Sequence, residues 1–299
     1  MKRGHWQILL AAVLFLLALG LTLYPVVSNW YIGRHQSRIQ TEYREVLEQT
    51  DSAEIESIRK RAVAYNKTIT PGAAEEAYSQ KSIRLAAEDY VNRLNVSGSG
   101  IMGYVEIPKI GVDLPIYHGT GADSLDRGTG HLLGSSLPVG GESTHTIITG
   151  HSGMASQKMF TDLEQLREGD IFYLHVLDET LTYEVREIHT VLPHDTTYLG
   201  IEPGEDLCTL VTCTPTGVNT HRLLVHGSRI PYVPTEETEA SAVPHEENTD
   251  SNWEKQYWLG VRLGLAAMVF LTLVAGAVLY IRRNRGRAVH RKGGRYVRK

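Results

Sequence analysis

Two long apolar runs without a charged residue limit what this chain can fold into. Residues 8–27 read ILLAAVLFLLALGLTLYPVV, and residues 263–281 read LGLAAMVFLTLVAGAVLYI. A bilayer core of about 30 Å needs about 20 apolar residues at the rise of a helix, and each run is close to that length. A wholly buried helix of a soluble fold is the alternative for each run. Basic residues beside both runs favour membrane spans.

The charges are distributed unevenly around these runs. Residues 1–28 contain Lys2 and Arg3 but no acid, and residues 257–299 contain ten basic residues and no acid. All 34 acidic residues therefore lie in 29–256, beside 18 basic ones, which gives this middle part a formal charge of −16. Such an acidic region argues against nucleic-acid binding, which needs clustered positive charge. The positive-inside rule predicts cytoplasmic termini and an exterior middle part.

The first apolar run also has a second interpretation, a cleaved signal peptide. Its apolar stretch is longer than the ~7–15 residues of a typical signal sequence, and a clear small-x-small cleavage site is missing. We therefore expect an uncleaved anchor over 1–28 and a second transmembrane helix over 257–281. The basic tail 282–299 is interpreted as a topology signal, with binding of anionic lipid as a secondary interpretation.

The part between the two anchors changes character along the chain. Residues 29–99 carry apolar residues at helical spacing, a capping box at 51–54 (DSAE) and a break at 70–72 (TPG), which together predict a helical extension. Residues 100–233 form short β-rich runs between turns and predict one domain. Residues 234–256 are acidic and polar, and they predict a flexible tether.

About eight short strands are predicted in the β-rich part, with a short helix at 159–167 between them. Leu181, Tyr183 and Val185 alternate with polar residues, but the next apolar residue is Ile188, so we expect a bulge near Arg186. The pattern predicts a mainly β domain that is closed, or nearly closed, into a barrel. The expected strands are 103–107, 114–117, 130–133, 144–149, 171–176, 181–191, 207–213 and 222–230.

The two cysteines lie in one predicted strand, LCTLVTC at 207–213. Their separation of five places them on opposite faces of the strand and too far apart to form a disulfide. Cys208 is flanked by strand residues and is expected in the core. Cys213 ends the strand before the turn TPTG, and nucleophiles favour such a position, where a rigid strand meets a loop.

Candidate partners for Cys213 follow from position alone. Arg222 opens the next strand, so a strand–loop–strand return would bring it beside Cys213, where it can stabilise a thiolate or an oxyanion. A surface arginine at a strand start is the plainer interpretation. Among 13 histidines, His151 has the best local context, in a glycine-flanked turn after a strand. The spacing does not exclude other histidines near strand ends as the base, and a lone histidine is more often structural than catalytic. These other candidates are His118, His131, His221 and His226.

Two motifs resolve this choice by resemblance. The stretch TLVTCTPTGVNTHR at 209–222 resembles the signature of the sortases, TLxTC followed by Arg, and CTPTGVNTHRLLVHG resembles the pilus-assembling class C in particular. TGHSG at 149–153 matches the catalytic-histidine motif of that class, and the likeness covers about 100–232. The resemblance implies a sortase-type eight-stranded β-barrel. It also implies that Cys213 is the nucleophile, His151 the general acid/base and Arg222 the oxyanion stabiliser.

The chain departs from the class C pattern at two places. Ser152 follows His151 where many relatives carry Arg, which puts only local substrate contacts in question. Class C enzymes also usually carry an Asp-Pro-aromatic lid in the extension, and this chain has no Asp-Pro pair. Asp89 and Tyr90 make a poor substitute because they lie in helix-forming sequence. We therefore expect a cleft that is open, or covered by apolar contact around Ile69 without a charge clamp on Arg222.

The resemblance implies a membrane-anchored cysteine transpeptidase on the outside of a Gram-positive cell. Such an enzyme cleaves LPxTG-like sorting signals and joins the acyl group to a pilin lysine. Its partners are pilins or surface proteins with these signals, together with the membrane, and we expect no metal and no other cofactor. One alternative is a sortase that anchors proteins to the cell wall. The other is a non-catalytic, membrane-tethered β-barrel binding module, which would not need Cys213.

Overall fold

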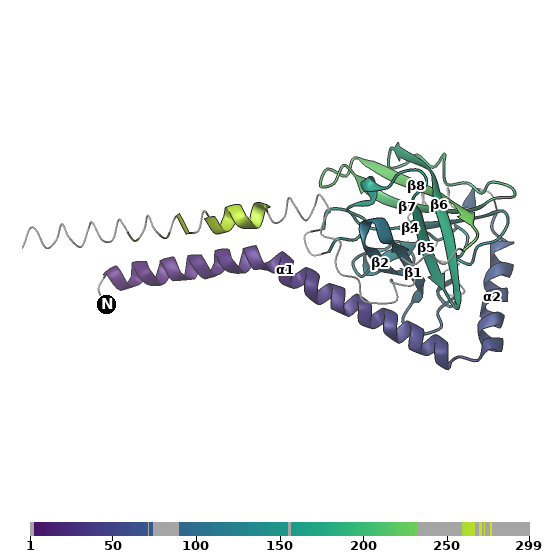
Figure 1. Ribbon diagram of the computed structural model, residues 1–299, viewed down its shortest axis with the longest axis horizontal. Coiled ribbons are helices and arrows are strands. Elements are labelled where there is room, and N and C mark those ends of the chain that lie inside the picture. Colours follow the sequence, from purple (N-terminus) through teal and green to yellow (C-terminus); the bar gives the residue numbers. More distant parts are fainter. Residues whose placement is uncertain are drawn as a thin grey trace, which may run out of the picture. The chain divides into compact units, whose positions relative to one another are not determined.

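The computed structural model describes residues 3–70, 72–73, 90–154, 157–232, 259–266, 269–270, 272 and 276 (Figure 1). The chain divides into two compact units, residues 1–25 with 252–299 and residues 26–251, and each is described by itself. The predicted tether 234–256 and most of the expected lid region lie outside the described residues.

The first unit contains the beginning of helix α1 (Arg3–Gln49) and a helical stretch at 259–266. Across the described residues, no helix combines the length and the apolar character that crossing a membrane requires. The two predicted transmembrane helices are thus not confirmed. From 271 onward, the structure describes only residues 272 and 276 of the second apolar run.

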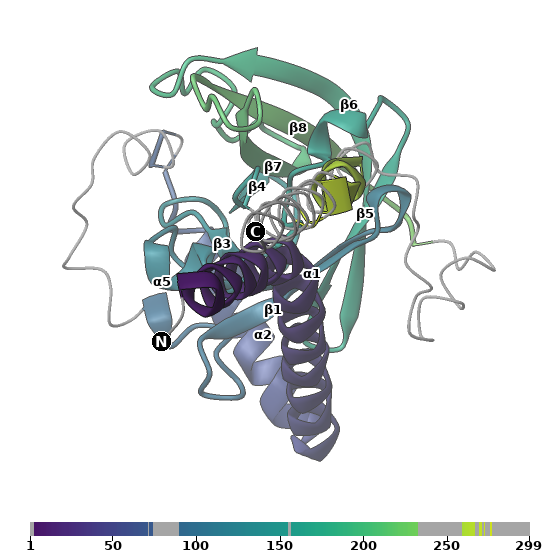
Figure 2. The same ribbon diagram turned by 90° about the vertical axis from the view of Figure 1, so that its left-hand side faces the viewer.

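The second unit contains a closed β-barrel of eight strands, as predicted. The strands follow one another around the barrel in the order β1-β2-β3-β4-β7-β8-β6-β5, and Figure 2 shows β6, β8, β7 and β4 as neighbours. β2 pairs with β3, and β4 with β7, in parallel, whereas the other neighbours are antiparallel. The strands are β1 (Ile101–Ile107), β2 (Val112–His118), β3 (Thr129–His131), β4 (Thr144–Thr149), β5 (Ile171–Val176), β6 (Glu179–Val191), β7 (Asp206–Thr214) and β8 (His221–Ile230).

The bulge predicted in β6 is present, because its register with β8 shifts between Val185 and Glu187. The helix predicted over 159–167 is wrong. Only the short 3₁₀ turn η2 (Leu163–Gln165) forms there. Met159 has a φ of 44°, in the left-handed region, and Leu166 is extended, so neither end can continue a helix. Two further short helices, η1 (Pro108–Ile110) and α5 (Ala122–Leu125), occupy connections between strands.

Apolar residues lie on both faces of the barrel wall and form a separate cluster on each. The inner face contributes Cys208 and Leu210 of β7 to the main core cluster. On the outer face, the connection between β6 and β7, residues 192–205, covers a second apolar cluster. We call this second cluster the outer cluster; its members are Leu132, Ile147, Val191, Leu199, Val211 and Leu224. Successive residues of β7 therefore serve opposite faces, as strand alternation requires.

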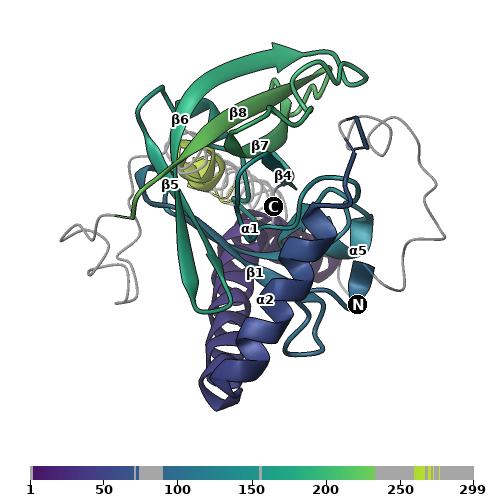
Figure 3. The same cartoon turned by 90° about the vertical axis from the view of Figure 1, so that its right-hand side faces the viewer.

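The helical extension packs against the barrel through both of its helices (Figure 3). The hydroxyl of Tyr43 in α1 donates to the carbonyl of Met102 at 3.1 Å and accepts from the amide of Leu177 at 3.1 Å. Helix α2 (Ser52–Asn66) begins after Asp51, whose carboxylate accepts from the Ala53 amide. Apolar residues of α2 join the main core cluster, so the extension is part of the folded unit.

The buried side chain of Asn66 ties the end of α2 to the barrel. Its amide accepts from the Leu137 amide at 2.7 Å and donates to the Leu137 carbonyl at 3.1 Å. We predict that Asn66→Ala lowers the free energy of unfolding by about 1–3 kcal/mol, since it leaves the Leu137 N–H without its partner. Urea unfolding measures this loss. The exposed neighbour variant Lys67→Ala should stay within about 0.5 kcal/mol, and equal losses for the two variants would contradict the prediction.

Candidate active site

Cys213 lies near the end of β7, where its side chain is half-buried. Its register partner on β8 is Arg222, and directly opposed residues of an antiparallel pair point to the same face of the sheet. The residue pair that follows along this face is Val211 with Leu224, both in the outer cluster. Cys213 and Arg222 therefore continue the outer face of the barrel beyond its covered apolar part.

Residue 151 lies on the other edge of β7, just after β4. The parallel pairing of β4 with β7 ends at Thr149 opposite Val211, but hydrogen bonds extend it further. The Gly150 amide donates to the Val211 carbonyl at 3.0 Å, and the Ser152 hydroxyl donates to the Cys213 carbonyl at 2.6 Å. Residue 151 is thus held level with Cys213. The backbone thus places the three predicted site residues in one row: residue 151 two positions after β4, residue 213 on β7 and residue 222 on β8.

Steric constraints explain why glycine occupies positions 150 and 153 of the TGHSG motif. A Cβ on Gly150 would lie 2.7 Å from the ring of Phe160, so no larger residue fits without a shift. Gly153 has a φ of 71°, and a Cβ there would lie 2.8 Å from the Thr216 side chain in the β7–β8 turn. The Phe160 amide donates to the His151 carbonyl at 3.0 Å and closes this turn. The backbone of His151 is therefore fixed by packing on both sides.

The side chain of Arg222 is anchored to the turn between β7 and β8. One guanidinium nitrogen, Nη1, donates to the carbonyls of His221 at 3.0 Å and Asn219 at 3.3 Å. The turn itself is closed by amides 218 and 219, which donate to the Pro215 carbonyl. An arginine held by one nitrogen still offers donors on its other nitrogens to a ligand.

Three contacts at this site were not predicted from the sequence. Ser152 was expected only to affect substrate contacts, yet its hydroxyl holds the backbone of Cys213. Oδ1 of Asp126, at the end of α5, lies 3.7 Å from Nε2 of His151. The Thr214 hydroxyl donates to Glu164 at 2.6 Å. Neither Asp126 nor Glu164 belongs to a recognisable sequence motif, so only the folded structure reveals that they lie at this site.

Three of the four competing histidines are held by buried or backbone contacts, whereas His221 is half-buried at the start of β8, opposite Thr214. His131 is fully buried on β3, where Nε2 donates to the Ser136 carbonyl and burial lowers its pKa to about 4. The Tyr90 hydroxyl bonds to Nδ1 of the same ring at 2.9 Å, so this tyrosine is held against β3 and is a poor lid, as expected. His118 bonds the carbonyls of Gly100 and Arg93. His226 is buried on β8.

Comparisons with known proteins identify the family of this chain. A sortase domain model matches residues 105–230. Sortase C of Streptococcus pneumoniae is 45% identical, with a TM-score of 0.59 over 66% of this chain and 100% of its own. Sortase C1 of Streptococcus agalactiae is 44% identical, with a TM-score of 0.60 over 66% and 100%. A sortase A of Streptococcus agalactiae is 27% identical over 221 residues, 73% of this chain and 82% of that protein.

A closed barrel with a cysteine at the end of a strand defines the class of protein as a β-barrel cysteine transpeptidase. The chain belongs to the sortase family, and its structural neighbours support class C. It is therefore an enzyme of the Gram-positive cell surface, and the alternative of a non-catalytic binding module is wrong.

The two thiols should differ sharply in reactivity. Cys208 is fully buried, and burial raises the pKa of its thiol well above the ordinary value, so it lacks both access and thiolate character. We predict that iodoacetamide labels only Cys213 in the folded chain and both cysteines after unfolding in urea. Peptide mass mapping measures the labelling. Cys213→Ala should leave the folded chain unlabelled, and labelling of Cys208 at a comparable rate would contradict the prediction.

Proposed function

We propose that the chain cleaves LPxTG-like sorting signals between Thr and Gly and joins the released acyl group to a lysine amine of a pilin. The observation that carries this proposal is the row formed by three chain segments: Cys213 on β7, with Arg222 opposite it on β8 and residue 151 level with it beyond β4. The row supplies a nucleophile, an acid/base group and a cationic donor, which acyl transfer requires.

The reaction follows from these three groups in two steps. The sulfur of Cys213 attacks the threonine carbonyl as its thiol proton passes to His151, and Arg222 stabilises the negative charge that develops on the carbonyl oxygen. The C–N bond to glycine breaks, and His151 donates a proton to the departing glycine amine. The acyl group is now a thioester on Cys213. A lysine amine then attacks this thioester, His151 accepts its proton, and an isopeptide bond forms as the thiolate leaves.

Pilins are the proposed acceptors because of the structural neighbours. The S. pneumoniae enzyme is described as informing on pilin substrate specificity, and a sortase C of Group B Streptococcus as pilus-related. Cell-wall anchoring is the second candidate, because sortases A are also among the relatives and structural neighbours, at 25–41% identity. The acceptor distinguishes the two candidates: a pilin lysine for the first and a peptidoglycan-precursor amine for the second.

A covalent adduct tests the proposal directly. We predict that full-length protein incubated with LPxTG peptides gains the mass of the acyl fragment on Cys213, because the thioester persists until an amine arrives. Intact and peptide mass spectrometry detect the adduct. Cys208→Ala should form it with some loss of stability, whereas Cys213→Ala should form none.

Arg222→Lys serves as the matched variant in the same assay. It keeps the charge but loses the planar fork of donors, so turnover should fall by roughly a hundredfold. An adduct on a residue other than Cys213, or wild-type turnover by Arg222→Lys, would overturn the assigned roles.

Membrane attachment through residues 1–28 and 257–281 completes the proposal. Its support is the sequence: two uncharged apolar runs with basic flanks and a strongly acidic middle. We predict that protease added to wall-stripped cells digests 29–256 and spares a tag placed after Lys299. A version of the chain with the tag inserted at 234–256 is the positive control, and digestion of the C-terminal tag in intact cells would contradict the two-span topology.

A further inference from the structure

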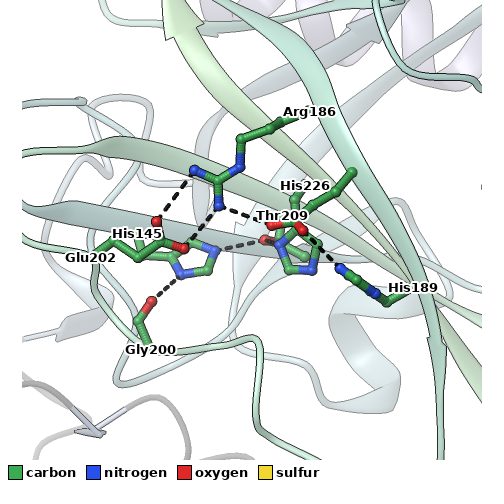
Figure 4. A network of polar contacts seen from close by, with 8 residues as sticks. His145, Arg186, His189, Gly200, Glu202, Thr209 and His226 are labelled. Atoms are coloured by element: carbon green, nitrogen blue, oxygen red, sulfur yellow. Dashed lines mark hydrogen bonds and ion pairs between the residues drawn. The ribbon is translucent and has the colours of Figure 1, made fainter.

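A series of hydrogen bonds crosses the outer face of the sheet below the β6–β7 connection (Figure 4). His145 of β4 bonds through Nδ1 to the Gly200 carbonyl at 2.7 Å and through Nε2 to the Thr209 hydroxyl at 2.6 Å. The same hydroxyl, on β7, bonds Nδ1 of His226 on β8 at 2.7 Å. The proposed reaction does not use any of these groups.

The Gly200 carbonyl at one end of the series determines which atom donates in each of these hydrogen bonds. A carbonyl only accepts, so Nδ1 of His145 carries a proton, and in a neutral ring Nε2 then accepts from Thr209. The threonine hydroxyl has a single hydrogen, so its oxygen accepts from Nδ1–H of His226. A neutral His226 therefore keeps a bare lone pair on Nε2.

Both rings are neutral near pH 7. Burial is the main cause that lowers the pKa of His226 to about 3, and the neighbouring His145 lowers it further. Burial also lowers the pKa of His145, although the bond to the Gly200 carbonyl opposes this shift. The proton positions deduced above therefore apply at physiological pH.

The ring of His226 lines a cavity of about 250 Å³. The residue is 3% exposed, and its Nε2 has no hydrogen-bond partner among the described residues. Because the bulge shifts the register of β6, Glu187 lies directly opposite His226. The other residues that line the cavity are Thr197, Tyr198, Gly200, Ile201 and Glu202.

Two carboxylates, those of Glu187 and Glu202, line the cavity. Arg186 donates to Glu202 through both terminal nitrogens, at 2.8 and 3.3 Å, and to Glu187 at 2.9 Å. Hydrogen bonds from His189 and, to a smaller extent, from Arg186 lower the pKa of Glu187, so this carboxylate is ionised. Two carboxylates thus face one guanidinium. Tyr198, stacked on His189 at 3.9 Å between ring centroids, adds an aromatic wall.

We propose that this cavity binds a primary ammonium group, that of a lysine side chain on a protein substrate. An unpartnered lone pair in a buried ring calls for a hydrogen-bond donor, and the two carboxylates beside it favour a donor that carries positive charge. The tyrosine ring favours the same charge through a cation–π contact. That the lysine belongs to a protein substrate rests on the function proposed above.

The bound ammonium is a docking group and not the attacking amine. The register pair Thr209–His226 lies four residues from the pair Cys213–Arg222 along the same strands, which corresponds to about 13 Å. The outer cluster residues Val211 and Leu224 lie between the two pairs. An amine that attacks the thioester must come within bonding distance of Cys213, so the cavity holds a second lysine and orients the protein that carries it.

Nitrogen NMR of full-length Cys213→Ala protein with ¹⁵N-labelled histidine tests both parts of this inference without turnover. In the free protein, Nδ1 of His226 should carry the proton and Nε2 should not. Titration with Nα-acetyl-lysine methylamide should shift the Nε2 resonance. The norleucine analogue, which lacks the ammonium, should leave it unchanged, and the arginine analogue should bind more weakly. Because the chain cannot form a thioester, failure here is separate from failure of the proposed function.

Substitutions test whether the Nε2 lone pair of His226 contributes to binding, independently of the stability of the fold. His226→Asn keeps a donor for Thr209 but removes Nε2, and it should weaken binding of the lysine probe by about tenfold to a hundredfold. Thr209→Val, which releases the ring from its fixed tautomer, should weaken it less, and Thr209→Ser should not. His194→Leu on the same connection, outside the cavity, is the control. A proton on Nε2 in the free protein, equal binding of the norleucine or arginine analogue, or unchanged binding by His226→Asn would overturn the inference.

Discussion

Strand β7 is hydrogen-bonded along both edges, and the site depends on these two pairings. One edge runs parallel to β4 and the other antiparallel to β8. The β8 pairing reaches the end of β7 and places 222 opposite 213, whereas the β4 pairing ends at Thr149 opposite Val211. Beyond that point the Gly150 amide and the Ser152 hydroxyl continue the contact with β7, which keeps residue 151 level with 213. Glycine at position 150 supports this arrangement, since a methyl group there would meet the Phe160 ring.

Features that depend on local periodicity could be predicted from the sequence. The alternation of strand side chains predicts that Cys208 and Cys213 face opposite sides, and the structure confirms a buried Cys208 and a half-buried Cys213. The break in parity at Ile188 likewise predicts the bulge in β6. The helix expected at 159–167 fails because Met159 adopts a left-handed backbone that no helical pattern in the sequence reveals.

Features that depend on strand order could not be predicted in this way. β7 pairs with β4, and β8 pairs with β6, although these partners are not consecutive in the chain. No local pattern encodes this order. The approach of Asp126 to His151, the bond from Ser152 to the Cys213 carbonyl and the series from Gly200 to His226 all follow from it. The choice of His151 among 13 histidines needed the motif, because the burial of His131 and His226 and the hydrogen bonds of His118 are visible only in the folded chain.

The bulge in β6 has a consequence for how this strand can change in evolution. Before it, Leu181, Tyr183 and Val185 face the core; after it, Ile188 faces inward and Glu187 lies opposite His226. Loss of the inserted residue would exchange the two faces of the second half of the strand, burying Glu187 and exposing Ile188. Point substitutions can therefore adjust either half independently, whereas an insertion or deletion at Arg186 would damage the core and the polar cavity in one event.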